Sequence, residues 1–175
     1  MKFASLLSLL LLIAPLAFAV SPGQVKVLEP DTTIAVSGSV IDAGFIGPGQ
    51  TFSVLISSKV DTGGKYGEGG NWDNLQAESL PEGWKASYSE YGPELKIHIK
   101  APPDAKEGKY RIALSVNDED DREQIGGKVT FYVDVVIRND VVAIIAYPEA
   151  LTVASGSPAR YIVKVVNPST ASDLF

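Results

Sequence analysis

The residues best able to do chemistry in this chain lie in a glycine-rich segment, residues 62–74. Tyr66 and Trp72 supply aromatic faces there, while Asn71 and Asp73 place an amide and a carboxylate beside Trp72. Aromatic faces stack on apolar sugar faces, and amides and carboxylates bind hydroxyl groups, so this set predicts a binding loop for a sugar or a protein partner. In the alternative interpretation the segment is a surface excursion, and Trp72 packs onto the edge of a sheet.

A second candidate is the acidic run of residues 117–123, which joins two strongly alternating segments. Asp118, Asp120 and Asp121 offer clustered carboxylate oxygens, the ligands that Ca²⁺ prefers. The run lacks the glycine and the terminal glutamate of an EF-hand loop, and charges at a hairpin tip also discourage pairing between sheet edges. Ca²⁺ is therefore the one cofactor that the sequence suggests, with a solvated hairpin tip as the alternative interpretation.

No catalytic constellation can be recognised in the chain. It has no cysteine and one histidine, which excludes a cysteine nucleophile, a thiolate metal site and a cupredoxin-type copper centre. His98 lies between Lys96 and Lys100 on the polar side of an alternating segment, and no Gly-x-Ser-x-Gly motif is present. No pattern places two carboxylates at the separation that glycoside hydrolysis needs. We therefore expect a protein that is not an enzyme.

The elements that must position these residues are β-strands, because apolar and polar residues alternate with a period of two almost throughout. Such alternation is typical of half-buried antiparallel strands, and no convincing helical stretch follows the N-terminal segment. Turns rich in glycine and proline separate the strands, which favours an all-β sandwich. The predicted strands are residues 24–28, 33–42, 51–60, 84–89, 94–100, 109–117 and 127–138.

Two further aromatic residues are predicted to serve the structure. Trp84 follows the turn Pro81-Glu82-Gly83, which can direct its ring inward as a large core anchor. Tyr110 opens an alternating strand after the loop of residues 101–109. That is where the phenol of a tyrosine corner bonds back to the preceding loop.

These segments resemble a known family. Over residues 24–138 the chain resembles the immunoglobulin-like domain of the alpha-galactosidase or NPCBM-associated type, found beside glycoside hydrolase catalytic modules. It is equally similar to repeats of archaeal S-layer-like and other prokaryotic surface proteins. The resemblance implies an immunoglobulin-like, fibronectin-III-like antiparallel β-sandwich without catalytic residues, and the longer, glycine-rich insertion at residues 62–79 departs from it. The matching features are Leu80-Pro81-x-Gly83-Trp84, Pro102-Pro103-Asp104-Ala105, Gly108-x-Tyr110 and Gly47-Pro48-Gly49-Gln50.

The N-terminal residues 1–19 have the pattern of a signal peptide. Lys2 precedes the apolar run of residues 6–17, and Ala17-Phe18-Ala19 fits the small-x-small cleavage rule. An uncleaved anchor is the alternative. The formal net charge of −6 lacks the basic footprint of a nucleic-acid binder, and no later apolar run is long enough to span a bilayer. We expect a secreted, extracellular protein that is associated with the cell surface.

The sandwich is expected over residues 20–140, and residues 141–175 are expected to begin a second β unit. Tyr161 opens an alternating segment after a turn with glycine and proline, as Phe52 does after the turn at residues 47–50. Two or three strands are too few for an independent sandwich, so we expect a partial second repeat that is truncated in this sequence. Completion by another chain and packing on the first domain are the alternatives.

These observations predict a non-catalytic structural and adhesion module, secreted or on the cell surface, that presents loops and sheet edges to other surface proteins or neighbouring repeats. The alternative is an accessory or carbohydrate-binding module of a secreted glycoside hydrolase or peptidase whose catalytic domain is absent from this chain. In that case glycans would be the partners. Neither interpretation involves nucleic acid.

Overall fold

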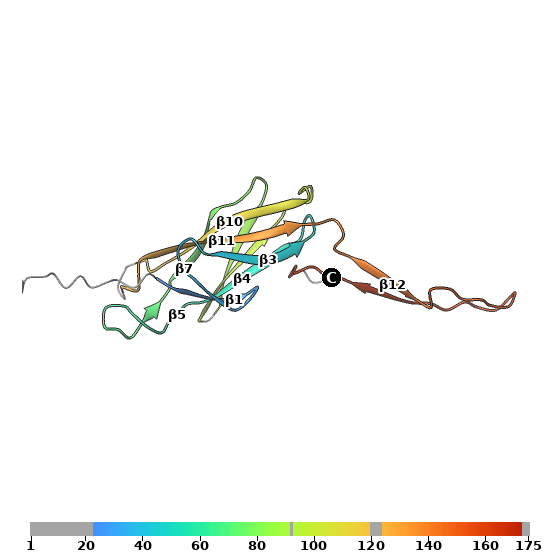
Figure 1. Ribbon diagram of the computed structural model, residues 1–175, viewed down its shortest axis with the longest axis horizontal. Coiled ribbons are helices and arrows are strands. Elements are labelled where there is room, and N and C mark those ends of the chain that lie inside the picture. Colours follow the sequence, from blue (N-terminus) through green and yellow to red (C-terminus); the bar gives the residue numbers. More distant parts are fainter. Residues whose placement is uncertain (1–22, 92, 120–123, 173–175) are drawn as a thin grey trace, which may run out of the picture.

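Two β-sheets form the body of the protein. The computed structural model describes residues 23–91, 93–119 and 124–172, and every regular element assigned in them is a strand. One sheet has five strands in the order β2-β1-β4-β9-β8, and the other has four in the order β3-β11-β10-β7 (Figure 1). The all-β prediction is confirmed, and the two sheets make a sandwich. The strands are β1 Val25–Glu29, β2 Thr33–Ala35, β3 Val40–Ile46, β4 Thr51–Ser57, β5 Lys59–Val60, β6 Gly70–Asn71, β7 Asn74–Ser79, β8 Lys85–Tyr91, β9 Glu94–Lys100, β10 Gly108–Asn117, β11 Lys128–Ile137, β12 Ala143–Tyr147 and β13 Ile162–Val166.

The core lies between the two sheets and is formed by the inward positions of the alternating strands. On β4, Phe52, Val54 and Ile56 are at most 1% exposed. Burying an aliphatic or aromatic side chain of this size stabilises a fold by roughly 1.5–3 kcal/mol, so the core can hold the sandwich together without a disulfide. The other inward side chains of the two sheets are equally buried and include Val25, Val27, Ile97 and Ile99 beside β4 and Ile112, Leu114, Val116, Phe131, Val133 and Val135 on the facing sheet.

The prediction of a single strand over residues 33–42 is wrong. The chain breaks into β2 and β3, which belong to different sheets. Gly38, with φ of +88°, forms the turn between them, and its N–H donates to the carbonyl of Thr130 at 2.8 Å. β3 then runs parallel to β11. Since a left-handed φ favours glycine, this residue lets the chain cross from one sheet to the other.

The insertion predicted over residues 62–79 contains an unpredicted strand. β7 pairs antiparallel with β10 and completes the four-stranded sheet, with Leu75 opposite Val116. Of its six residues only Leu75 is a large apolar side chain, so the local signal for a strand is weak. Pairing with a long, strongly alternating neighbour decides the conformation here, as is common for strand propensity.

Trp84 and Tyr110 lie together at one end of the sandwich. Trp84 is 7% exposed, and its ring centroid lies 5.3 Å from that of Tyr110. The Tyr110 hydroxyl donates to the backbone carbonyl of Lys106 at 2.9 Å. This bond ties the loop before β10 to the strand that follows it.

β12 and β13 form a separate two-stranded sheet that extends away from the sandwich (Figure 1). After β13 the chain returns: Thr170 donates its backbone N–H to the carbonyl of Phe45 at 2.9 Å, and Ser172 does the same to Thr51 at 2.8 Å. A Cβ on Gly44 would lie 2.7 Å from Cγ2 of Thr170, so a glycine is needed for this approach. The segment that follows β13 therefore contacts the sandwich again through Thr170 and Ser172.

The sequence predicts a signal peptide for export and no later segment that spans a membrane. The signal peptide predicted over residues 1–19 lies outside the described residues. Within the described ranges, no helix is long and apolar enough to cross a bilayer.

Candidate functional site

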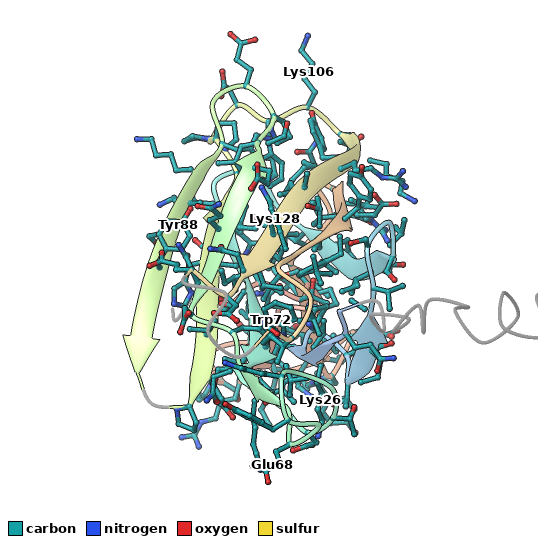
Figure 2. All side chains as sticks on the ribbon, turned by 90° about the vertical axis from the view of Figure 1, so that its left-hand side faces the viewer. Lys26, Glu68, Trp72, Tyr88, Lys106 and Lys128 are labelled. Atoms are coloured by element: carbon teal, nitrogen blue, oxygen red, sulfur yellow. The ribbon has the colours of Figure 1, made fainter. Side chains whose placement is uncertain are left out.

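Trp72 is a core residue, which corrects its predicted role in ligand binding. Its side chain is 2% exposed, and its indole N–H donates to the carbonyl of Gln24 at 3.2 Å. Its backbone N–H donates to the carbonyl of Ser58 at 2.7 Å, and Figure 2 shows the ring inside the sandwich. A buried ring is not available for stacking on a sugar. The residue lies deeper than the sheet edge proposed as the alternative.

The other residues of the predicted loop site are separated. Tyr66 is 80% exposed and lines a shallow pocket of about 330 Å³ together with Asn71. The ammonium group of Lys65 lies 5.5 Å from the Tyr66 ring centroid, so a cation already occupies this aromatic neighbourhood. Asp73 lines a different cavity. The structure thus brings Tyr66 and Asn71 together and places Asp73 elsewhere.

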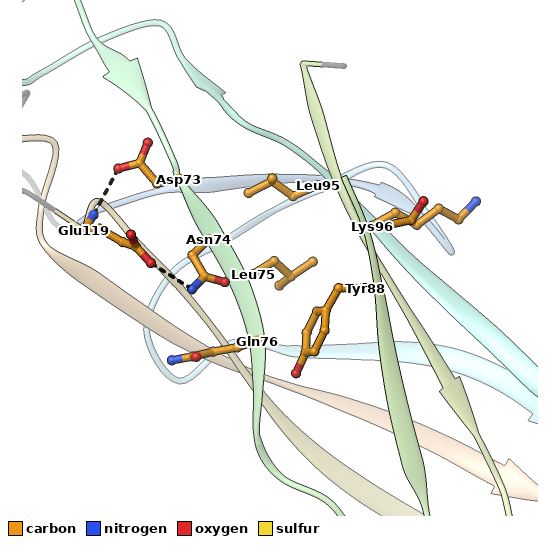
Figure 3. A pocket seen from close by; sticks show the side chains of 9 residues that line it. Asp73, Asn74, Leu75, Gln76, Tyr88, Leu95, Lys96 and Glu119 are labelled. Atoms are coloured by element: carbon orange, nitrogen blue, oxygen red, sulfur yellow. Dashed lines mark hydrogen bonds between the residues drawn. The ribbon is translucent and has the colours of Figure 1, made fainter. Parts of the chain in front are cut away.

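That second cavity is a groove where the two sheets part. β7 and β8 are the edge strands of their respective sheets, and β9 lies beside β8. The groove between them has a volume of about 410 Å³, which is within the range of small-molecule sites (Figure 3). Its lining residues are Asp73, Asn74, Leu75, Gln76, Tyr88, Ser89, Leu95, Lys96 and Glu119.

Three polar side chains at one end of the groove hold each other in place. Oδ2 of Asp73 accepts the backbone N–H of Glu119 at 3.0 Å. Nδ2 of Asn74 donates to Oε1 of Glu119 at 3.2 Å. β7 and the turn after β10 are thereby tied together, and the bonds fix the orientation of two carboxylates and an amide at the groove mouth.

Tyr88 forms the aromatic wall of the groove. It pairs with Ile97 and so belongs to the inner face of its sheet, but it lies on the edge strand and is 53% exposed. Its hydroxyl accepts the backbone N–H of Ala77 at 3.3 Å, which directs the ring from β8 toward β7. Sequence reasoning missed this residue, although an aromatic residue at an inward position of a predicted strand was visible in the sequence.

The predicted calcium site is only partly within the described residues. Asp118 is 6% exposed, and its backbone N–H donates to the carbonyl of Gly127 at 3.2 Å. Asp120 and Asp121 lie outside the described residues. In the described ranges there is no group of three or more His, Asp or Glu side chains that could hold a metal ion. Calcium binding at this tip stays a prediction.

His98 has a serine neighbour on the outer face of the five-stranded sheet. Its Nδ1 lies 2.9 Å from Oγ of Ser53, which is directly opposite in the β4–β9 register. Oγ of Ser53 donates in turn to Oγ of Ser172 at 3.2 Å. A serine nucleophile needs its histidine oriented by a third group, and none of the described carboxylates bonds to His98. Ser53 instead bonds to the returning end of the chain at Ser172.

Among the described residues, the largest pKa shift belongs to a carboxylate on the outer face of β10 and β11. Asp134 is 4% exposed and accepts two hydrogen bonds from Arg111, at 2.7 and 2.8 Å. Lys109 lies 2.8 Å away from the same carboxylate. The Arg111 guanidinium, assisted by Lys109, holds the pKa of Asp134 well below its usual range. The Asp134 carboxylate forms a cross-strand ion pair with Arg111 and does not line the groove.

Comparison with known proteins adds no family assignment. No protein-family model matches the chain, and no curated protein matches it. The function is therefore inferred from the strand order, the contacts and the exposed surfaces.

Proposed function

We propose that this chain is a non-catalytic structural and adhesion module of a secreted or cell-surface protein, and that residues 141–175 are part of a second β-sandwich repeat. The β12–β13 hairpin carries this proposal. Its apolar residues are exposed on both faces: Ile144 is 70% exposed, Ile162 71% and Val165 65%. A lone hairpin is marginally stable in water, and soluble proteins rarely expose a large contiguous apolar patch. The hairpin therefore belongs against another β-module.

The strand order supports an immunoglobulin-like assignment of the first unit. The order β1-β4-β9-β8 corresponds to strands A, B, E and D, and the order β7-β10-β11 corresponds to C, F and G. Near the start of β10, the F position, the Tyr110 hydroxyl bonds back to the loop, as in a tyrosine corner. β3 adds a parallel strand beside β11.

A local repeat supports the second unit. Pro30 is followed seven residues later by Ser37-Gly38-Ser39, and Pro148 is followed at the same spacing by Ser155-Gly156-Ser157. Both glycines have φ of +88°. In both turns the second serine donates its backbone N–H to the carbonyl three residues earlier, at 2.9 and 3.0 Å. The same sequence thus forms the same turn in the two units.

The return contact supports a stiff arrangement of the two units. Oγ1 of Thr170 donates to the carbonyl of Ala43 at 2.6 Å, in addition to the backbone bond to Phe45. The two units are therefore joined to each other by the covalent linker and, at a second point, by the hydrogen bonds of Thr170. A rigid array of this kind acts by display, because it sets loops and sheet edges at fixed positions for neighbouring proteins.

The proposal is tested on the cells that produce the protein. We would isolate it from the envelope and the medium, determine its intact mass and N-terminus, and cross-link intact cells. We expect a species that starts near Val20 and cross-links through residues 141–172 to another β-sandwich module. Retention of residues 1–19 in a cytoplasmic species would contradict the proposal. A catalytic domain on the same polypeptide would favour the accessory-module alternative.

A further inference from the structure

We propose that the groove between β7 and β8–β9 is a binding site for a short, uncharged oligosaccharide. This inference does not rest on the proposed structural function. It rests on the aromatic wall, the apolar floor and the fixed oxygen acceptors of the groove. Its volume of about 410 Å³ is of the size that small ligands occupy.

The aromatic wall supplies a surface on which a sugar ring can stack. Tyr88 is half exposed, and its hydroxyl is held by Ala77 at 3.3 Å, so the ring is fixed without being covered. Figure 3 shows the ring reaching from β8 toward β7, with Leu75 and Leu95 beside it. A tyrosine loses little conformational freedom on binding, which makes it an effective contact. An apolar sugar face therefore finds matching surface here.

The polar end of the groove is rich in acceptors. Asp73 and Glu119 each use one carboxylate oxygen in their mutual contacts with Asn74 and the backbone. Their second oxygens, and Oδ1 of Asn74, accept no hydrogen bond from any described residue. Fixed acceptors suit the hydroxyl donors of a sugar. Lys96, the one cation among the lining residues, is paired with Glu29 at 3.1 Å and extends away from Asp73 and Glu119 in Figure 3. The two carboxylates would therefore repel a uronate, sialate or phosphate group, and an uncharged ligand fits the groove better.

The most direct competitor is an extended peptide that pairs with the free edge of β7. The backbone N–H of Ala77 is one of the donors such a strand would use, and it is already bonded to the Tyr88 hydroxyl. The Tyr88 ring also extends toward that edge (Figure 3). An incoming strand would have to break the Ala77–Tyr88 hydrogen bond and move the ring. A sugar would stack on the ring in its present position. The observations therefore favour a saccharide over a peptide.

The experiment is an NMR titration of the ¹⁵N-labelled full chain with cellotriose, maltotriose, mannotriose and chitotriose. Sialyllactose is the anionic comparison. We expect at least one neutral trisaccharide to shift resonances of β7 and β8, and sialyllactose to bind more weakly. Tyr88→Ala should weaken binding by about tenfold or more, as loss of a central tyrosine contact commonly does. Tyr66→Ala is the matched control, because that tyrosine is more exposed but lies outside the groove.

Tyr88→Phe keeps the ring and should retain most of the affinity, whereas Asp73→Ala and Asn74→Ala should each reduce it. Thermal unfolding of every variant checks that the fold is intact. Three results would overturn the proposal: no groove shift with any neutral sugar at millimolar concentration, equal affinity of Tyr88→Ala and wild type, or tighter binding of the anionic sugar. Binding of extended peptides without sugars would reassign the groove to strand pairing.

Discussion

The sandwich and the β12–β13 hairpin use the same local pattern with opposite results. Val54 of β4 and Val163 of β13 each lie in an alternating strand that follows a turn with glycine and proline, yet Val54 is 0% exposed and Val163 is 59% exposed. Both strands have an antiparallel partner. The difference is a second sheet, which covers β4 and which β13 lacks within the described residues. Alternation therefore specifies a strand, but burial requires a facing layer.

The two regions also differ in how polar groups are used. In the sandwich, a nearly buried carboxylate is paired across strands, as Asp134 is with Arg111. In the hairpin, Lys164 lies among exposed apolar residues, and no described residue forms an ion pair with it. In the sandwich, burial requires such a charge to be paired, whereas the hairpin has few buried groups to satisfy. The following predictions test whether this division between the regions holds.

The largest effect is expected from Trp72→Ala. Removing this buried ring should lower the free energy of unfolding by about 3–5 kcal/mol, because it leaves a large cavity between the sheets. Chemical denaturation followed by tyrosine fluorescence and circular dichroism measures the change. Tyr66→Ala on the neighbouring loop should shift stability by less than about 0.5 kcal/mol. An unchanged unfolding midpoint for Trp72→Ala would show that the ring is outside the core.

A smaller effect is expected from the ion pair of the sandwich, and it depends on pH. Because the folded pKa of Asp134 is depressed, the pair stabilises the fold above the ordinary carboxyl pKa of about 4 and loses this contribution as pH falls below it. Asp134→Asn should cost about 1–2 kcal/mol at pH 7 and little at low pH. Urea unfolding from pH 7 down to pH 2 measures the difference. Asp104→Asn, on an exposed loop, is the control and should leave the free energy of unfolding at pH 7 within about 0.5 kcal/mol.

Tyr110→Phe isolates one hydrogen bond of the sandwich. Loss of the bond to the Lys106 carbonyl should destabilise the protein by about 1 kcal/mol, since the ring stays packed against Trp84. Differential scanning calorimetry measures the shift. Tyr161→Phe beside β13 removes the hydroxyl of a half-exposed tyrosine and should leave the transition unchanged. Equal shifts of the melting temperature for Tyr110→Phe and Tyr161→Phe would show that the Tyr110–Lys106 hydrogen bond does not stabilise the fold.

The smallest effect on stability is expected in the hairpin. Replacing Ile144 and Val165 with serine should change the free energy of unfolding of the sandwich by less than about 0.5 kcal/mol, because both side chains are exposed. The same change should reduce binding of a hydrophobic dye and any self-association seen by light scattering. A large loss of sandwich stability would mean that the two regions fold as one unit.

Several strands could be predicted from local pattern because their sequences alternate strongly. β9, β10 and β11 are each predicted within a few residues, and their inward positions form part of the core. The strand predicted over residues 51–60 is correct for β4 but wrong at its end, because Lys59–Val60 forms β5 and pairs with β6 in a separate sheet. β7 could not be predicted, since its sequence has one large apolar residue and its conformation depends on pairing with β10. Gly38 itself indicates a break in the predicted strand. Which sheet each flanking strand joins depends on the whole fold.

The candidate site was harder to predict than the fold. Trp72 and Asp73 are adjacent in the chain, yet one lies in the core and the other lines the groove. Consecutive residues of an extended chain point to opposite sides, so adjacency in sequence does not imply a shared surface. Tyr88 joins the groove only because its strand is at the edge of a sheet.

By itself the sequence determined that the chain forms β-strands, which side chains alternate into a core, and that no cysteine chemistry is available. These properties follow from residue type and from the period-two geometry of an extended backbone. Only the tertiary structure decided which strands lie at the edges, where the sheets part, which aromatic residue is covered and which faces water. Those outcomes depend on pairing between segments far apart in the chain, and no local pattern encodes them.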